Sequence, residues 1–327
     1  MKKTVLLLSF LVCALRAASA EPVSELAGFS VLGKVDLGEL AKGEIKTAAG
    51  PRMNTPRYLS VQSVFVVSQP PAAVLAAMKH FDPTAHRELK VFLHAELPAA
   101  STSGNFSRLP TAPGNSAVKT LSEKTEKMAS DLQVSKAEAQ KFSAGKPVWG
   151  FWADLLAQRA REFASGGARA QAPYDHTSAA VQPGKELAGL VRQQGAVNKQ
   201  FGSFLNSTGL LGGKGSLKPD LYWELLQVED DGVLTLGASY TRGTSGGGYQ
   251  LADGLYYASG GYDVALTLYQ LWPVDVGGKP STLVWRGDFI SAASLGELHG
   301  IERIASEGAM KKDISKAVSA FKSEAAR

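Results

Sequence analysis

The most constraining feature of the chain is a series of five β-type segments near its C-terminal end. Each is rich in β-branched and aromatic residues, and short turn sequences separate them. The segments are 221–229, 233–241, 249–258, 262–272 and 281–291. Glycine and aspartate at 230–232 and 276–279 are typical of hairpin connections. The pattern predicts an antiparallel meander.

A long amphipathic helix is predicted after the meander. Its apolar stripe is expected to contain Leu298, Ile301, Ala305, Met310, Ile314, Ala317, Val318 and Phe321. Such a stripe must pack on another element, and the meander is the natural partner. Upstream, strands are predicted over 58–68 and 88–97, and Pro70 and Pro71 open a helix between them. The fold class is therefore α+β, with an antiparallel curved sheet packed on a long C-terminal helix.

Helical signals dominate the region 118–206, which is predicted to be a mostly helical insertion into a single α+β domain over 57–327. The segment 21–56 shows no sustained period and is expected to be an irregular lead-in. Trp149, Phe151 and Trp152 lie within four positions, which is more than one helical stripe can bury. They suggest a surface in 118–206 that binds a protein partner.

The first twenty residues have the form of a secretory signal peptide. Lys2 and Lys3 precede an apolar run from Val5 to Leu15, and Ala18-Ser19-Ala20 provides a small-x-small cleavage site. The run is shorter than the roughly 20 residues that span a bilayer. Export to the periplasm or the extracellular space is therefore predicted, with no transmembrane segment after cleavage. Cys13 would leave with the signal, so the mature chain would have neither disulfides nor thiolate chemistry.

The charge of the mature chain argues against nucleic-acid binding. Lys2, Lys3 and Arg16 would be removed with the signal, so 32 basic and 30 acidic residues remain and the net charge falls from +5 to +2. No basic run longer than two residues follows. The electrostatic footprint of a protein that binds nucleic acid is absent.

The order of these elements resembles that of the START and polyketide-cyclase superfamily. The most similar stretch is SVQSVFVVSQPPAAVL at 60–75, and the resemblance covers 58–81 and 221–325. It implies a helix-grip fold, in which a curved sheet wraps around the last helix. It also implies a cavity between sheet and helix, which the family commonly uses for lipids or other apolar molecules. The family shares no catalytic signature, and the region 118–206 is longer than the family's pattern.

Strand alternation gives the candidate site, since side chains change face with each residue. The set expected on the concave face includes Tyr249, Leu251, Asp253, Leu255 and Tyr257, then Tyr262, Val264, Leu266, Leu268, Gln270 and Trp272, and finally Leu283, Trp285 and Phe289. Among these, Asp253 would be an acid among apolar groups, which is costly unless a ligand or cation meets it. Two alternatives stay open: Asp253-Gly254 could form a hairpin turn in water, and the aromatic set could be ordinary core.

Two further charged motifs have a functional and a structural interpretation. Arg242 precedes the glycine-rich segment 243–248 and could close over a ligand as part of a flap, or could belong to a simple hairpin. Arg286-Gly287-Asp288 has the letters of a cell-adhesion tripeptide, but it lies within a predicted strand with both charges opposite Trp285. A solvated or cross-strand ion pair is the expected outcome there.

No motif predicts a metal or a cofactor. The histidines at 80, 86 and 94 are six and eight residues apart, unlike a short zinc-binding pattern. No phosphate-binding loop or dinucleotide fingerprint is present. The sequence therefore predicts an exported protein that binds an apolar or amphipathic small molecule, such as a lipid, through Asp253, Arg242, Tyr249, Tyr257, Tyr262, Trp272 and Trp285. Two alternatives are an envelope interaction protein that uses 118–206 and an enzyme of unknown reaction.

Overall fold

The computed structural model describes residues 20–143, 145, 147–177 and 180–325. The signal peptide predicted at 1–20 lies outside this part of the chain, apart from Ala20. Among the described residues no helix combines the length and the apolar character needed to cross a bilayer.

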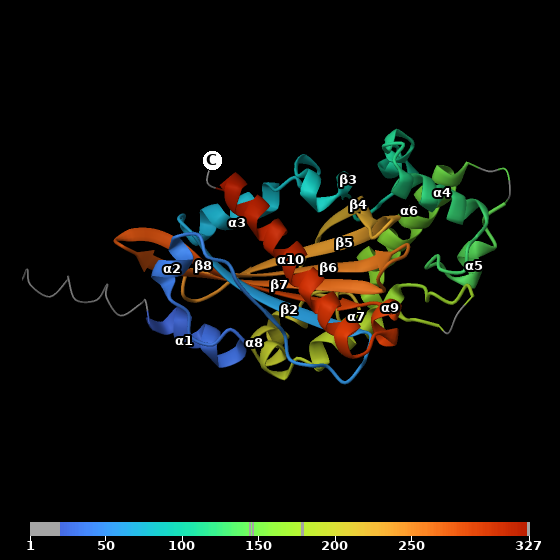
Figure 1. Ribbon diagram of the computed structural model, residues 1–327. Helices are drawn as coiled ribbons and strands as arrows, with labels where there is room; N and C mark the ends of the chain where they lie inside the picture. Colours follow the sequence, from blue (N-terminus) through green and yellow to red (C-terminus); the bar gives the residue numbers. More distant parts are fainter. Residues whose placement is uncertain (1–19, 144, 146, 178–179, 326–327) are drawn as a thin grey trace, which may run out of the picture.

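The protein is built on one antiparallel sheet of eight strands in the order β1-β2-β8-β7-β6-β5-β4-β3 (Figure 1). The strands are β1 (Lys46–Ala49), β2 (Tyr58–Val67), β3 (Val91–Leu97), β4 (Asp220–Val228), β5 (Asp231–Gly243), β6 (Tyr249–Ala258), β7 (Val264–Val276) and β8 (Lys279–Ser291). The predicted meander is confirmed as β4 to β8, with each strand paired to the next. Gly277 and Gly278 form the two-residue turn between β7 and β8. Both have positive φ, at 62° and 79°, as a type I′ hairpin turn requires.

Ten α-helices are described around the sheet. They are α1 (Ala20–Phe29), α2 (Leu37–Ala41), α3 (Pro71–His80), α4 (Ser116–Glu126), α5 (Lys136–Ala139), α6 (Val148–Gly166), α7 (Pro183–Arg192), α8 (Gly195–Leu205), α9 (Ala293–Glu297) and α10 (Gly300–Ala325). Short 3-10 helices η2 (Pro83–Ala85), η3 (Arg87–Leu89), η4 (Ser103–Phe106), η5 (Leu109–Thr111) and η6 (Ala168–Ala170) join some of them. The mixture confirms an α+β protein, and α4 to α8 supply the helical region predicted between β3 and β4.

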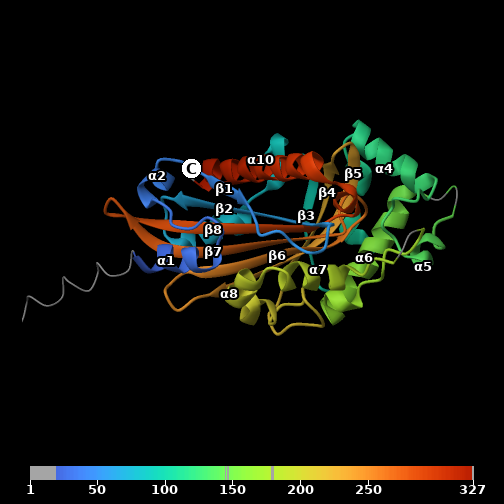
Figure 2. The same ribbon diagram turned by 60° about the horizontal axis from the view of Figure 1, so that its bottom comes forward.

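The two faces of the sheet have different partners. In Figure 2 the sheet lies between α10 on one side and α1, α7 and α8 on the other. On the α10 face, Val61, Phe65 and Val284 pack with Val318 and Phe321 in a small apolar cluster. The opposite face forms most of the larger core, which the helices of the insertion also enter. The apolar layer between the sheet and α10 is therefore the thinner of the two.

The expectation of an irregular lead-in at 21–56 is wrong, because this segment forms α1, α2 and β1. Leu26, Phe29 and Leu40 are buried in the large core. Asp36 caps α2 by accepting hydrogen bonds from the backbone N–H groups of Gly38 and Glu39. These helices are too short to show a sustained apolar period, and tertiary burial stabilises them.

The apolar stripe expected along the last helix is correct from Met310 onward and wrong at its start. Ile314, Val318 and Phe321 are buried, whereas Ile301 is 85% exposed and Ala305 is also exposed. The first half is attached by Arg303, whose guanidinium donates to the carbonyl oxygens of Pro56, Tyr58 and Leu295. The sequence period continues beyond the point where the sheet offers a surface to pack on.

Candidate functional site

A cavity of about 520 Å³ lies between the sheet and the helices α3 and α10. One part of its wall is apolar and is formed by Phe65, Met78, Phe81, Leu251, Val318 and Phe321. The other part is polar and is formed by His94, Tyr222, Glu224, Asp253, Thr267 and Arg286. The combination is that of a site for a molecule with both an apolar and a polar portion.

Strand register brings the polar side chains onto one face. Asp253 on β6 lies opposite Thr267 on β7 and Ser239 on β5, and residues directly opposite each other share a face. At the far edge, Glu224 on β4 pairs with His94 on β3. With Arg286 on β8, polar groups from six strands, β3 to β8, thus surround the same volume.

Gly237 allows Tyr222 to reach Asp253 across the intervening strand. A Cβ atom at position 237 would lie only 2.1 Å from Cζ of Tyr222. Without that atom, the ring crosses over β5, and its hydroxyl donates a 2.6 Å hydrogen bond to Oδ1 of Asp253. A shift in the register of β5 and β6 occurs at the same place, between Leu236 and Gly237.

The cavity makes Asp253 an unusually weak acid. Burial raises the pKa of Asp253 to about 6, and the charge of nearby Glu224 adds to the effect of burial. The hydrogen bond from Tyr222 acts in the opposite direction because it stabilises the carboxylate. Burial also raises the pKa of Tyr222 well above its usual value, so this phenol remains protonated and available as a donor.

His94 and Glu224 form a second pair on the polar wall. Nδ1 of His94 lies 3.0 Å from Oε1 of Glu224. Burial opposes protonation of the imidazole, but the hydrogen bond and the charge of Glu224 prevail and raise the pKa of His94. The positive charge of a protonated His94 is therefore directed to Glu224.

The charges of Arg286 and Asp288 form the third pair. Nε and Nη2 of Arg286 donate to the two carboxylate oxygens of Asp288 at 2.8 and 2.7 Å, and Thr267 donates to the same carboxylate. Both charges lie opposite Trp285, as expected. The pair is not solvated, since the side chains are only 16% and 8% exposed. It forms within β8 beside the cavity, and the tripeptide is not presented at the surface.

Of the predicted site residues, Asp253 alone lines this cavity. It lies in the middle of β6, so the alternative of a hairpin turn at Asp253-Gly254 is wrong. Tyr249 lies on the same face but packs at the margin of the apolar cluster beneath α10. The remaining candidates are placed elsewhere.

Trp272 and Trp285 lie on the opposite face, in the large core. Trp285 is fully buried, and its ring lies 4.9 Å from that of Phe29 and 5.5 Å from that of Phe201. Trp272 donates from its indole nitrogen to Glu25 of α1. The expectation that they share a face with Asp253 is wrong because Trp285 pairs with Gln270, while Asp253 pairs with Thr267. Alternation shows which residues of one strand share a face, but only the register shows which residues of the neighbouring strand share that face.

Arg242 borders a separate pocket of about 570 Å³ on that opposite face. Its guanidinium donates to Gln250 at 2.6 Å and to Ser203 at 3.1 Å, and it lies over the ring of Phe204. The geometry ties the end of β5 to α8. Arg242 and Asp253 therefore cannot contact one molecule in the cavity, in contrast to the prediction.

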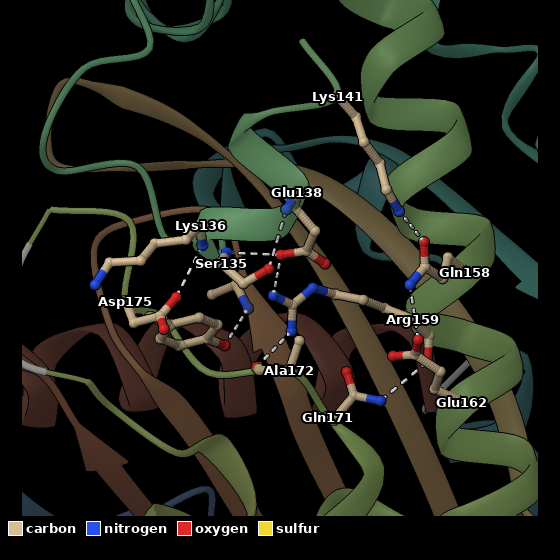
Figure 3. A network of polar contacts seen from close by, with 12 residues as sticks. Ser135, Lys136, Glu138, Lys141, Gln158, Arg159, Glu162, Gln171, Ala172 and Asp175 are labelled. Atoms are coloured by element: carbon tan, nitrogen blue, oxygen red, sulfur yellow. Dashed lines mark hydrogen bonds and ion pairs between the residues drawn. The ribbon is translucent and has the colours of Figure 1, made fainter.

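Tyr257 is also a core residue. Its ring lies 4.4 Å below the guanidinium of Arg159, a fully buried cation on α6. Figure 3 shows that Arg159 points to Glu138 and to the carbonyl oxygen of Ala172. Its Nη2 donates to Oε2 of Glu138 at 2.6 Å, and its Nη1 donates to the Ala172 oxygen at 3.0 Å. This network joins α5, α6 and the segment after η6. Tyr262, for its part, packs on a small cluster with Leu59 and Leu295.

The aromatic surface suggested for 118–206 is not formed by the three predicted residues. Trp152 is fully buried and donates to Thr125, while Trp149 and Phe151 are half-buried against the core. Within the described ranges, the large apolar side chains that are exposed are Val31, Ile301 and Ile304. None of them belongs to the helical insertion.

Four residues of the polar wall were missed in the sequence: His94, Tyr222, Glu224 and Thr267. For the first three the signal was strand alternation. In β3, His94 and Glu96 share a parity, as do Tyr222 and Glu224 in β4, so each strand carries polar groups on one face. Arg286 could have been assigned to the same face as Asp253 had the register of β7 and β8 been known.

The described residues contain no group of three or more histidine, cysteine, aspartate or glutamate side chains arranged to hold a metal ion. Comparison with known proteins found no matching family model, no matching curated protein and no matching solved structure.

Proposed function

We propose that this protein binds an amphipathic small molecule in the cavity between the sheet and α10, as a carrier or sensor. The observation that carries the proposal is the division of the cavity wall into an apolar and a polar part around about 520 Å³. Burial of an apolar portion would provide the main driving force, and the polar wall would fix the orientation. The resemblance to helix-grip proteins, which use the corresponding space for apolar ligands, supports the same assignment.

The proposal includes export of the protein. A cleavable signal at 1–20 would release a chain starting at Glu21. Fractionation of the cells that make the protein, followed by mass determination of the intact chain, tests this part. The expected mass is that of residues 21–327, found outside the cytoplasm. A cytoplasmic chain that retains Met1 would contradict it.

A cavity-filling substitution tests the binding site. Ala317 lines the cavity from α10, whereas Ala309 lies exposed on the same helix. Ala317→Trp would occupy part of the cavity beneath α10, and Ala309→Trp is the matched control for the effect of tryptophan on the helix. Binding is measured with the uncharged fluorophore N-phenylnaphthylamine, whose emission increases in apolar surroundings. Loss of the signal in Ala317→Trp alone is expected.

Two results would contradict the proposed site. Either the fluorophore does not bind to the parent protein at all, or it binds to Ala317→Trp as well as to the parent. Melting curves of both variants show whether a lost signal reflects unfolding. A folded Ala317→Trp variant that fails to bind places the ligand under α10.

A further inference from the structure

The cavity has a carboxylate, that of Asp253, with no ion-pair partner among the described residues. Each positive group of the deep polar wall is already paired, Arg286 with Asp288 and His94 with Glu224. Asp253 receives one hydrogen bond, from the neutral hydroxyl of Tyr222 to Oδ1. No donor in the described part of the chain reaches its second oxygen, Oδ2, and the side chain borders the cavity.

No further lining cation in the described part of the chain bonds to Asp253. Lys322 of α10 lies outside the lining, with Nζ 6.0 Å from the centre of the Phe65 ring. The wall contributed by α10 consists of Ala317, Val318 and Phe321, which are uncharged. From α3, Lys79 lies at the rim and pairs with Asp220 at 3.2 Å, and His80 is exposed. The other titratable groups that line the cavity are His94, Tyr222, Glu224, Tyr269 and Arg286 in the interior and Glu96 at the exposed rim. Among these lining residues the carboxylates of Asp253 and Glu96 have no ion-pair partner, so the wall has an excess of negative charge.

We infer that the polar group of the ligand is a protonated amine, which pairs with Oδ2 of Asp253 while its apolar portion lies against Met78, Phe81 and Phe321. This inference rests on the proposed function and specifies the class of ligand. An amine supplies the charge that the cavity lacks and makes a charge-assisted hydrogen bond, about twice as strong as a neutral one. A carboxylate would add to the excess negative charge, and an alcohol would give only a neutral hydrogen bond.

Three ligands with the same octyl chain separate the possibilities: octylamine, octanol and octanoate. Titration calorimetry at pH 7.5 compares their affinities for the parent protein. Octylamine is expected to bind about tenfold more tightly than octanol, because the charged bond replaces a neutral one. Octanoate is expected to bind more weakly than octanol.

Asp253→Asn removes the charge with little change in shape and should abolish the preference of octylamine over octanol. The matched control is Asp230→Asn, which makes the same chemical change at an exposed position outside the cavity. This control should retain the preference. A second readout is pH, since the parent should lose its preference at pH 5, where Asp253 is protonated and the amine stays charged. Asp253→Asn, measured at the same pH, separates the titration of Asp253 from that of the other groups of the wall.

The outcomes distinguish the inference from the proposed function. If none of the three ligands binds, the proposed cavity function fails and the inference fails with it. If octanol or octanoate binds as tightly as octylamine, the cavity function stands and the amine is wrong. A preference for octylamine that survives in Asp253→Asn also overturns the assignment to Asp253.

Discussion

The phenolic oxygen of Tyr222 lies 2.6 Å from Oδ1 of Asp253, although the strand β5 separates the strands that carry them. The contact joins the edge half of the sheet to its centre. No donor in the described part of the chain reaches the second carboxylate oxygen of Asp253.

Tyr222→Phe should raise the pKa of Asp253 above about 6. The hydrogen bond from the phenol stabilises the carboxylate, so its loss favours the protonated form, and burial and Glu224 remain. Carbon-detected NMR titration of the carboxyl group measures the change. A pKa that stays the same or falls would show that the hydroxyl does not hold the carboxylate.

Gly237→Ala should displace the ring of Tyr222. The new Cβ would lie 2.1 Å from Cζ of that ring, far inside contact distance. Such overpacking typically costs about 1–3 kcal/mol of unfolding free energy. Denaturant unfolding measures the loss. The double variant Gly237→Ala, Tyr222→Phe retains the ring and should not recover stability, whereas Gly237→Ala, Tyr222→Ala should recover part of it. Equal stability of Gly237→Ala and the parent would contradict the close approach.

Asp253→Asn should change how stability depends on pH. The folded-state pKa of about 6 lies above the unfolded value of 3.8, so ionisation of Asp253 destabilises the fold. The stability of the parent relative to the variant is then greatest below about pH 4 and is lost as pH rises through about 6. A separation of about two units corresponds to at most about 3 kcal/mol.

Unfolding free energies of the parent and Asp253→Asn, measured from pH 4 to 8, provide the test. The unfolding free energy of the variant relative to that of the parent should increase across this range and then level off above pH 7. A difference that is constant with pH would show that Asp253 titrates normally. A difference of opposite slope would mean that a cation of the protein pairs with it.

The meander and the last helix could be predicted from sequence because their patterns are local. Alternation along 249–258 defined β6 and set Asp253 on the face of Leu251. The relation between strands could not be predicted in this way. A shift of one residue in register moves a whole strand's set of side chains to the other face, so Leu266, Leu268 and Trp272 were assigned to the face of Asp253 when they lie on the other.

The polar wall was partly missed for a related reason. Tyr222 reaches Asp253 only because Gly237 on a third strand lacks a side chain, and no spacing in the sequence reveals such a three-strand arrangement. The buried ion pair of Arg159 and Glu138 could not be predicted from the sequence either. Glu138 forms a capping box with Ser135, but its ion-pair partner comes from a helix 21 residues away.

Glu138→Gln should destabilise the protein strongly. Arg159 is fully buried, and removal of the carboxylate leaves its charge uncompensated, which typically costs about 3–5 kcal/mol. Asp313→Asn breaks an exposed pair with Lys316 on α10 and serves as the control, with an expected change within about 0.5 kcal/mol. Denaturant unfolding of both variants provides the comparison. Similar small losses in the two would show that the Arg159 network contributes little to stability.

Native mass spectrometry of the protein purified from the cells that make it tests the central claim most directly. The parent is expected to carry a stoichiometric adduct, released on denaturation, whose mass and fragments identify an amine with an apolar portion. Ala317→Trp, purified in parallel, should lack the adduct, and Ala309→Trp should retain it. An adduct that survives in Ala317→Trp, or a parent protein that is free of any adduct and binds none of the octyl ligands, would contradict the account.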